Sequence, residues 1–329
     1  MKDIELPRKV LVGHGVLKKT GGLIKSLHLR GRSYVICDRI TREVAGNSVA
    51  SQTHSEIVEE TTAEGIKERI HKSAKYLIAV GGGTVIDAVK IAAYDAGIPY
   101  ISIPTAASHD GIASPRASVK KDKPMSFMTN SPLGIVADTL IIANAPERLL
   151  SAGCADAISN YTAVLDWQLA KKEKNEYYGD YAAALSMLSA EIVMDNADKV
   201  KENVSIVVEA LISSGVAIGI AGSSRPCSGS EHQFSHSLDI ICEKPALHGE
   251  QCGVGTIMMA YLHKADWKRV RRSLEKVGAP VNARQLGIDD STIIEALTKA
   301  HNVRDRYTIL RDGLSERRAE NLAKKTGVI

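Results

Sequence analysis

The chain has 329 residues, of which 44% are hydrophobic and 24% charged, a composition typical of a globular protein that buries its own core. Its 42 Lys and Arg residues exceed its 38 Asp and Glu residues by only four, and both signs are scattered along the chain. No basic stripe is present, which argues against nucleic acid as the main partner. The length favours two domains.

Cysteine usage and hydropathy indicate a cytoplasmic protein. The five cysteines are an odd number without C-x-x-C spacing, so neither a disulfide framework nor a zinc ribbon is expected, and we expect them to fill small core spaces. The longest charge-free apolar stretch, residues 210–224, is shorter than the ~20 residues that a membrane span requires. The first ten residues lack the apolar core of a signal peptide.

The first part of the chain alternates short β-branched runs with amphipathic stretches of helical length. Alternation of this kind predicts parallel pairing through crossover helices, hence an α/β fold with a Rossmann-like, doubly wound sheet whose ligand lies beyond the carboxyl ends of the strands. The predicted strands are residues 9–13, 33–38, 55–60, 76–82, 100–105 and 134–139. The predicted helices are residues 15–27, 41–50, 64–71 and 84–96.

From about Pro146 the pattern changes to successive Ala- and Leu-rich segments of 3.6-residue period, which predicts an all-helical domain. We therefore expect one domain over residues 1–145 and a second over residues 146–329, with a ligand in the cleft between them. The predicted helices of the second domain are residues 146–172, 181–201, 204–221, 230–241, 248–263, 266–277 and 291–300.

An apolar strand runs directly into Gly81, Gly82 and Gly83 and then into a helix. Glycines let a backbone approach a phosphate, and a helix start offers free N–H groups and a positive dipole end. The pattern departs from G-x-G-x-x-G because Ile86 replaces the third glycine, so a tight turn without a ligand is the alternative. Asp38, just past the second strand, is placed to bind an adenosine ribose; its alternative is a solvated surface residue.

A second polar loop, residues 103–116, follows the next predicted strand along the chain. It carries Thr105, Ser108, Asp110 and Ser114 together with glycine and alanine, which supply hydroxyls, a carboxylate and exposed backbone groups. Loops at strand ends commonly hold ligands, although a capped turn is the plainer interpretation.

The third group is a set of histidines in the helical half. His232 and His236 are four residues apart, so a helix places both imidazoles on one face, and His248 opens the next predicted helix. Asp156, in a small and apolar segment, is the best-placed carboxylate to join them, and together they predict a catalytic metal site. The alternative for any single histidine is a hydrogen-bonded structural role. Six histidines in charged surroundings are expected on the surface: His14, His28, His54, His71, His263 and His301.

These motifs occur in a recognisable order: GGGTVIDAVK, PTAASHDGIASP, GCADAISN, SGSEHQFSHSLD and ALHGEQCGVGT. In that order, over nearly the whole chain, they resemble the archaeal sn-glycerol-1-phosphate dehydrogenases, which belong to the superfamily of iron-containing alcohol dehydrogenases, glycerol dehydrogenases and 3-dehydroquinate synthases. The resemblance implies an N-terminal dinucleotide-binding domain, a C-terminal helical metal- and substrate-binding domain, zinc, and NAD(H) or NADP(H).

Carried over motif by motif, the resemblance implies a role for each site residue. The implied zinc ligands are Asp156, His232 and His248, and the implied substrate-lining and catalytic residues are Asp110, Asp156 and His236. The implied coenzyme-binding residues are Gly82, Gly83, Thr84, Val85, Ile86, Asp87, Thr105, Ala106, Ala107, Ser108 and Ser114. Lys120 and Lys121 stand where related glycerol dehydrogenases have a tyrosine near the nicotinamide, so contacts beyond Arg116 are not carried over.

The implied reaction is reduction of dihydroxyacetone phosphate to sn-glycerol 1-phosphate, a precursor of archaeal ether phospholipids. Zinc with an open position would polarise the ketone oxygen, and a proton would reach the developing alkoxide past His236 or Asp110. For the phosphate, residues 228–230 at a helix start or Arg225 are candidates. We expect a small-molecule substrate and a homo-oligomer. A glycerol dehydrogenase, a 3-dehydroquinate synthase-like lyase and a nucleotide sensor without turnover are the alternatives.

Overall fold

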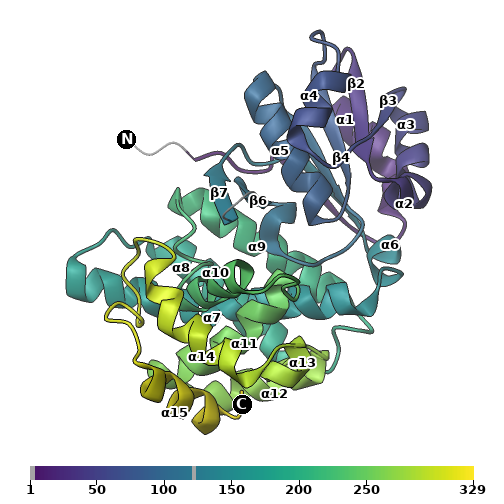
Figure 1. Cartoon of the computed structure of the whole chain (residues 1–329). Helices are drawn as coiled ribbons and strands as arrows, with labels where there is room; N and C mark the ends of the chain where they lie inside the picture. Colours follow the sequence, from purple (N-terminus) through teal and green to yellow (C-terminus); the bar gives the residue numbers. More distant parts are fainter. Residues whose placement is uncertain (1–3, 121–123) are drawn as a thin grey trace.

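The computed structural model describes residues 4–120 and 124–329. Its N-terminal part holds a six-stranded parallel sheet in the order β1-β8-β5-β4-β2-β3 (Figure 1). The strands are β1 Lys9–Gly13, β2 Ser33–Cys37, β3 Glu56–Glu59, β4 Tyr76–Gly81, β5 Tyr100–Pro104 and β8 Gly134–Asp138. All six predicted strands and their parallel pairing are confirmed.

Helices cover both faces of this sheet because its strands are apolar on both sides. Ile36, Leu77 and Ile135 lie in one buried cluster, whereas their chain neighbours Val35, Ile78 and Val136 lie in another. The covering elements are η1 Val16–Lys19, α1 Thr20–Ser26, α2 Arg39–Thr41, η2 Arg42–Gly46, α3 Asn47–Thr53, α4 Ala63–Arg69, α5 Gly83–Ala96, η3 Asp110–Ile112 and α6 Thr139–Ala143. The predicted helix over residues 41–50 is thus interrupted by a π-helical turn, η2.

The sequence analysis missed an antiparallel hairpin formed by β6 Arg116–Lys120 and β7 Pro124–Met128. It follows the polar loop after β5, and in Figure 1 it lies between the sheet and the helical part of the chain. Strand β6 packs against α5, and β7 contacts α10 (Ser230–Ile241). Lys121 lies outside the described residues.

The remainder of the described chain is helical, as predicted. The helices are α7 Glu147–Lys174, α8 Asp180–Asp195, α9 Ser205–Ala221, α10, α11 His248–Leu262, α12 Trp267–Val277, α13 Ala283–Leu286, α14 Asp290–Lys299, η4 Ala300–Asn302 and α15 Glu316–Thr326. The prediction that a helix continues to residue 201 is wrong, because α8 ends at Asp195 and a series of turns follows. Helices α13 and α15 were not predicted. Over the described residues, no helix is both long and apolar enough to cross a membrane.

Two close backbone contacts join α7 to the loop that follows β5 and α11 to α7. A Cβ atom on Gly153 in α7 would lie 2.0 Å from the Ala107 carbonyl oxygen, and one on Gly249 in α11 would lie 2.0 Å from the Ala152 carbonyl oxygen. Only glycine permits these approaches. The loop, α7 and α11 therefore stack backbone to backbone, which brings together the residues that flank these glycines.

Candidate metal and dinucleotide site

Four side chains that can ligate a metal meet where α7, α10 and α11 pack together. They are Asp156 on α7, His232 on α10, and His248 and Cys252 on the first two turns of α11, and one ligand atom from each lies within 4.8 Å of the others. Asp156 Oδ1 is 3.8 Å from His248 Nε2, and the His232 and His248 rings are 4.8 Å apart. The structure thus brings together the three predicted metal ligands.

Glu231 orients the His232 imidazole. His232 Nδ1 lies 2.9 Å from Glu231 Oε1, and the same oxygen accepts the Gly229 N–H at 2.6 Å. Thr162 donates to the other carboxylate oxygen at 2.8 Å. When Glu231 is ionised, its carboxylate can only accept from His232 Nδ1, which places the imidazole proton on Nδ1 and leaves the Nε2 lone pair for a metal.

Ser235 orients the imidazole of His248. Its hydroxyl donates to Gln251 Oε1 at 2.6 Å, so the Ser235 oxygen is left to accept from His248 Nδ1 at 3.2 Å. His248 Nε2 then faces Asp156 and lies 3.6 Å from the Cys252 sulfur. Cys252 is fully buried, as predicted, and so are the other cysteines except Cys242, which is half-buried; the sequence analysis did not predict the place of Cys252 beside the metal ligands.

The electrostatics of the group suit a cation. Burial raises the pKa of the Asp156 carboxyl well above its ordinary value, and the nearby Asp110 carboxyl raises it further. Burial lowers the pKa values of His232 and His248 well below the ordinary range, so both imidazoles are neutral. A buried carboxylate whose charge no neighbouring imidazolium balances, beside two neutral imidazole donors, is a donor set that fits a divalent transition metal.

His236 lies beside this group without being part of it. Its ring is 5.7 Å from the His248 ring and 6.3 Å from the His232 ring, and its Nδ1 lies 3.7 Å from Asp239 Oδ2. Asp110 reaches the group through its backbone, whose N–H donates to Asp156 Oδ2 at 3.0 Å. Both residues lie outside the group of possible metal ligands, and their role in lining the substrate stays a prediction.

The glycine turn joins β4 to α5 at the carboxyl edge of the sheet. A Cβ on Gly82 would meet no atom within 4 Å, whereas one on Gly83 would lie 1.8 Å from His109 Nε2. Val85 and Ile86 are buried in the core and Asp87 pairs with Lys90 at 2.9 Å, so a ligand at this helix start meets backbone N–H groups rather than the Val85 and Ile86 side chains.

The other predicted coenzyme residues lie at the same edge because β5, β4 and β2 are neighbours. Thr105 donates its backbone N–H to Gly81 O at 3.1 Å, and Ser114 is buried with its hydroxyl 3.4 Å from Arg116 O. Asp38 caps α2 by accepting the Thr41 N–H at 2.7 Å. The prediction of a ribose ligand at Asp38 therefore has to accommodate a structural role for one of its carboxylate oxygens.

The expectation that six histidines lie on the surface is correct for four of them and wrong for two. His14, His28, His54 and His71 are exposed. His263 is half-buried with Nε2 3.0 Å from Asp166 Oδ1, and His301 is half-buried against Gly313. The sequence analysis also missed Glu231 and His109, although both stand inside the quoted motifs, next to His232 and Asp110.

A parallel sheet joined to a helical part is also the fold of a solved iron-containing alcohol dehydrogenase from Corynebacterium glutamicum, with a TM-score of 0.72 at 17% identity over 99% of this chain and 96% of that one. The family profile described as iron-containing alcohol dehydrogenase matches residues 11–146. A solved glycerol dehydrogenase from Schizosaccharomyces pombe has the same fold, with a TM-score of 0.82 at 19% identity over 99% of this chain and 90% of that one.

Full-length relatives narrow the assignment. Glycerol-1-phosphate dehydrogenase (NAD(P)+) from Methanosarcina acetivorans is 51% identical, covering 100% of this chain and 97% of the relative. The protein of the same name from Pyrococcus furiosus is also 51% identical and covers 100% of both chains. The chain belongs to the glycerol-1-phosphate dehydrogenase family, a family of oxidoreductases.

Proposed function

We propose that this enzyme reduces dihydroxyacetone phosphate to sn-glycerol 1-phosphate with NADH or NADPH, using zinc held by Asp156, His232 and His248. The observation that carries the proposal is the position of this ligand group at the foot of the loop that follows β5, the strand next to the glycine turn. The names of the full-length relatives support the substrate and the coenzyme. The product would supply the backbone of archaeal ether phospholipids.

When bound, the metal would polarise the ketone oxygen and the reduced coenzyme would supply the hydride. The residues of this chain prepare the site for that chemistry. Glu231 and Ser235 engage Nδ1 of His232 and of His248, so Nε2 of each imidazole is left for a metal, and Nε2 of His248 lies 3.8 Å from Asp156 Oδ1. The close packing of α7 against the loop at Ala107 fixes the distance between the metal ligands and the predicted coenzyme loop.

Asp110 and His236 are the proposed proton-handling residues. Burial raises the pKa of the Asp110 carboxyl, which keeps a proton on it at higher pH than on a solvated aspartate. Burial lowers the pKa of His236, so its imidazole is neutral and suited to accept or relay a proton. Either group would pass the proton to the ketone oxygen through water as the alcohol forms.

For the coenzyme, we propose that backbone N–H groups of Gly83, Thr84 and Val85 bind the pyrophosphate, because they open helix α5 beside the unobstructed Gly82. Asp87, the loop from Thr105 to Ser108, and Ser114 would complete the nicotinamide side, and Asp38 would bind the adenosine ribose. The predicted cytoplasmic location and homo-oligomeric assembly stay predictions.

The deciding experiment is coenzyme oxidation with dihydroxyacetone phosphate, followed by chiral analysis of the product. We expect stoichiometric loss of NADH or NADPH and formation of sn-glycerol 1-phosphate. A protein that turns over only glycerol and dihydroxyacetone would be a glycerol dehydrogenase. Turnover of a sugar phosphate without net coenzyme oxidation would indicate a dehydroquinate synthase-like lyase, and coenzyme binding without any turnover would indicate a sensor.

A further inference from the structure

The segment that follows η4 lies directly against the helix that carries His232 and His236. The Gln233 side chain on α10 donates to the carbonyl oxygens of Arg304 at 3.4 Å and Arg306 at 3.5 Å, and Thr308 donates to its Oε1 at 2.8 Å. Gln233 is the residue after His232. The backbone of this arginine segment, residues 304–306, is therefore held beside the metal ligands.

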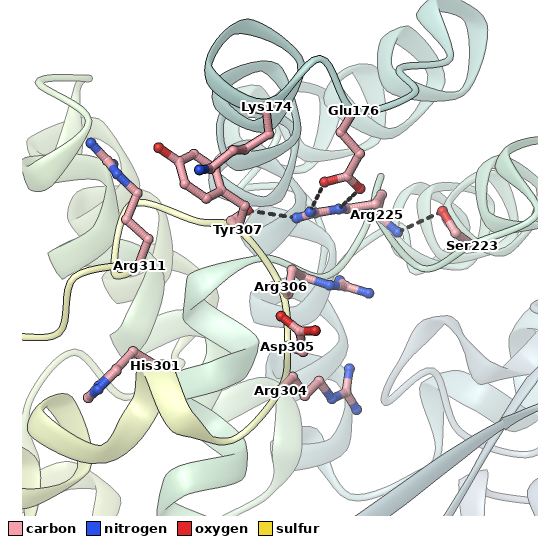
Figure 2. Close-up of a pocket in the computed structure, with 10 residues that line it drawn as sticks. All are labelled: Lys174, Glu176, Ser223, Arg225, His301, Arg304, Asp305, Arg306, Tyr307 and Arg311. Atoms are coloured by element: carbon pink, nitrogen blue, oxygen red, sulfur yellow. Dashed lines mark hydrogen bonds and ion pairs between the residues drawn. The ribbon is translucent and has the colours of Figure 1, made fainter.

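Among the described residues, no carboxylate forms an ion pair with either guanidinium group of the arginine segment. Arg306 donates to Ser228 O and, at 2.9 Å, to Ser224 Oγ, both neutral acceptors. Within residues 4–120 and 124–329, no group accepts a hydrogen bond from the Arg304 guanidinium and no carboxylate pairs with it. Figure 2 shows both guanidinium groups extending from the segment to the same side, along a cavity of about 760 Å³.

Burial makes these charges costly. It lowers the pKa of Arg304, which the Arg116 charge lowers further, and it lowers the pKa of Arg306 to about 9, to which the charges of Arg225 and Arg304 also contribute against a weaker opposing effect of Glu231. The positive charges of Arg304 and Arg306 also lower the pKa values of His232 and His236, so this field reaches the proposed substrate site. Desolvated guanidinium groups without a directly bonded carboxylate are stabilised by an anion, and phosphate matches their fork geometry.

The phosphate donors suggested by sequence are already engaged within the fold. Arg225 forms an ion pair with Glu176 and donates to Tyr307 O at 2.9 Å (Figure 2). Ser230 donates both its N–H and its hydroxyl to Asp166 at 2.6 Å, and the Gly229 N–H donates to Glu231. Gly229 and Ser230 build the start of α10, and neither they nor Arg225 is free to bind a substrate.

We propose that Arg304, supported by Arg306, binds the phosphate dianion of the substrate while the ketone end lies at Asp156, His232 and His248. This inference rests on the proposed function and deepens it, because it names the group that selects a phosphorylated triose over its unphosphorylated counterpart. Arg304 contacts the phosphate through its free guanidinium. Arg306, fixed by Ser224 and Ser228, contributes mainly charge.

The test replaces Arg304 by Met and compares dihydroxyacetone phosphate with dihydroxyacetone at saturating NADH. We expect kcat/KM for the phosphorylated ketone to fall by about 100-fold or more, the scale of a lost charge-assisted contact, while that for dihydroxyacetone changes by less than about threefold. Competitive inhibition by inorganic phosphate should disappear in R304M. Bound zinc and the KM values of both coenzymes should stay unchanged.

Arg311→Met is the matched control. It removes a guanidinium from the same cavity, but Arg311 lies over the Tyr307 ring and beside Asp312, so we expect little change with either ketone. Arg304→Lys keeps the charge without the fork and should fall between wild type and R304M. If R304M does not fold, this variant carries the test.

Three results separate the possibilities. An unchanged KM for dihydroxyacetone phosphate together with unchanged phosphate inhibition in folded R304M overturns the inference. A rise in KM for NADPH instead of the ketone assigns Arg304 to the coenzyme phosphates and also overturns it. If the wild-type enzyme does not reduce dihydroxyacetone phosphate, the proposed function fails. Calorimetry with inorganic phosphate then still tests the anion site. Binding by wild type but not by R304M would establish the site, and no binding by wild type would reject it.

Discussion

His232 Nδ1 and Glu231 Oε1 lie 2.9 Å apart, and this contact determines which nitrogen of a proposed zinc ligand faces the metal site. We expect Glu231→Gln to lower zinc affinity by about 10- to 100-fold, because a neutral amide holds the imidazole less firmly and makes it less basic. Competition against a chelator measures the change. Thr162→Val, which removes a donor to the far oxygen of Glu231, is the milder control; equal zinc affinity in E231Q and wild type would contradict this role.

Zinc binding should release a proton from Asp156. Burial raises the pKa of this carboxyl, so the metal-free protein holds the proton to higher pH than a solvated aspartate would, whereas His232 and His248 are already neutral. Since the metal binds the carboxylate, zinc affinity should rise as pH increases through the raised pKa and level off above it. Calorimetry in buffers of different ionisation enthalpy, over roughly pH 5 to 8, measures the release.

Asp156→Asn provides the control for that measurement. The amide cannot release a proton in this range, so D156N should bind zinc weakly and without the buffer-dependent heat. Proton release that persists in D156N would assign it to another group, such as the Cys252 thiol, whose sulfur lies 3.6 Å from His248 Nε2.

His236→Ala should keep about one zinc per chain while kcat/KM for the ketone falls by about 100-fold, because its ring lies outside the ligand group and beside Asp239. Metal analysis and steady-state kinetics on the same preparation separate the two effects. His232→Ala is the comparison variant, in which metal and activity should be lost together. Loss of zinc in H236A to the same degree would make His236 a further ligand.

The preference for NADH over NADPH tests the proposed role of Asp38 at the ribose, provided that the substitution preserves the cap of α2. Asp38→Gly would remove both the charge and the cap, whereas Asp38→Asn keeps an acceptor for the Thr41 N–H. We expect D38N to shift kcat/KM toward NADPH by ~1–2 kcal/mol, about 5- to 30-fold, because the repulsion of the 2′-phosphate is removed. Arg39 is exposed at the same turn, while Arg42 is paired with Glu59.

Both coenzymes must be compared at one ionic strength, since salt screens this interaction. Thr41→Val, which breaks the other half of the capping box, should leave the NADH to NADPH ratio unchanged. A ratio that D38N leaves unaltered would mean that Asp38 serves only as a cap.

Gly83→Ala should weaken coenzyme binding. The new methyl group would overlap the His109 imidazole, which would have to leave its place over the start of α5. We expect the KM for NADH to rise roughly tenfold or more, equivalent to ~1.4 kcal/mol. Gly22→Ala in α1, where a Cβ meets nothing within 4 Å, is the control and should leave the KM unchanged. Unaltered coenzyme kinetics in G83A would contradict a dinucleotide at this turn.

Sequence was most informative where local pattern and tertiary structure agree. The six β-branched runs became the six strands of the parallel sheet, and the spacing of His232 and His236 placed both rings on one face of α10. Two residues were misjudged because the deciding partner is distant along the chain. His263 stands among charged residues, but its partner Asp166 is 97 positions away. Arg304 is one of many surface-like arginines until the fold lays it against Gln233, 71 positions earlier.

The contacts of Gly153 with Ala107 and of Gly249 with Ala152 leave no side chain between three successive layers of backbone. Side chains at an ordinary helix interface can change rotamer and let two elements slide by an ångström or so, but this seam has none that could do so. Any movement that admits a coenzyme would therefore have to leave this seam closed. The loop at Ala107 and the helices that bear Asp156 and His248 would turn as one body, and the reacting groups would keep their spacing from one catalytic cycle to the next.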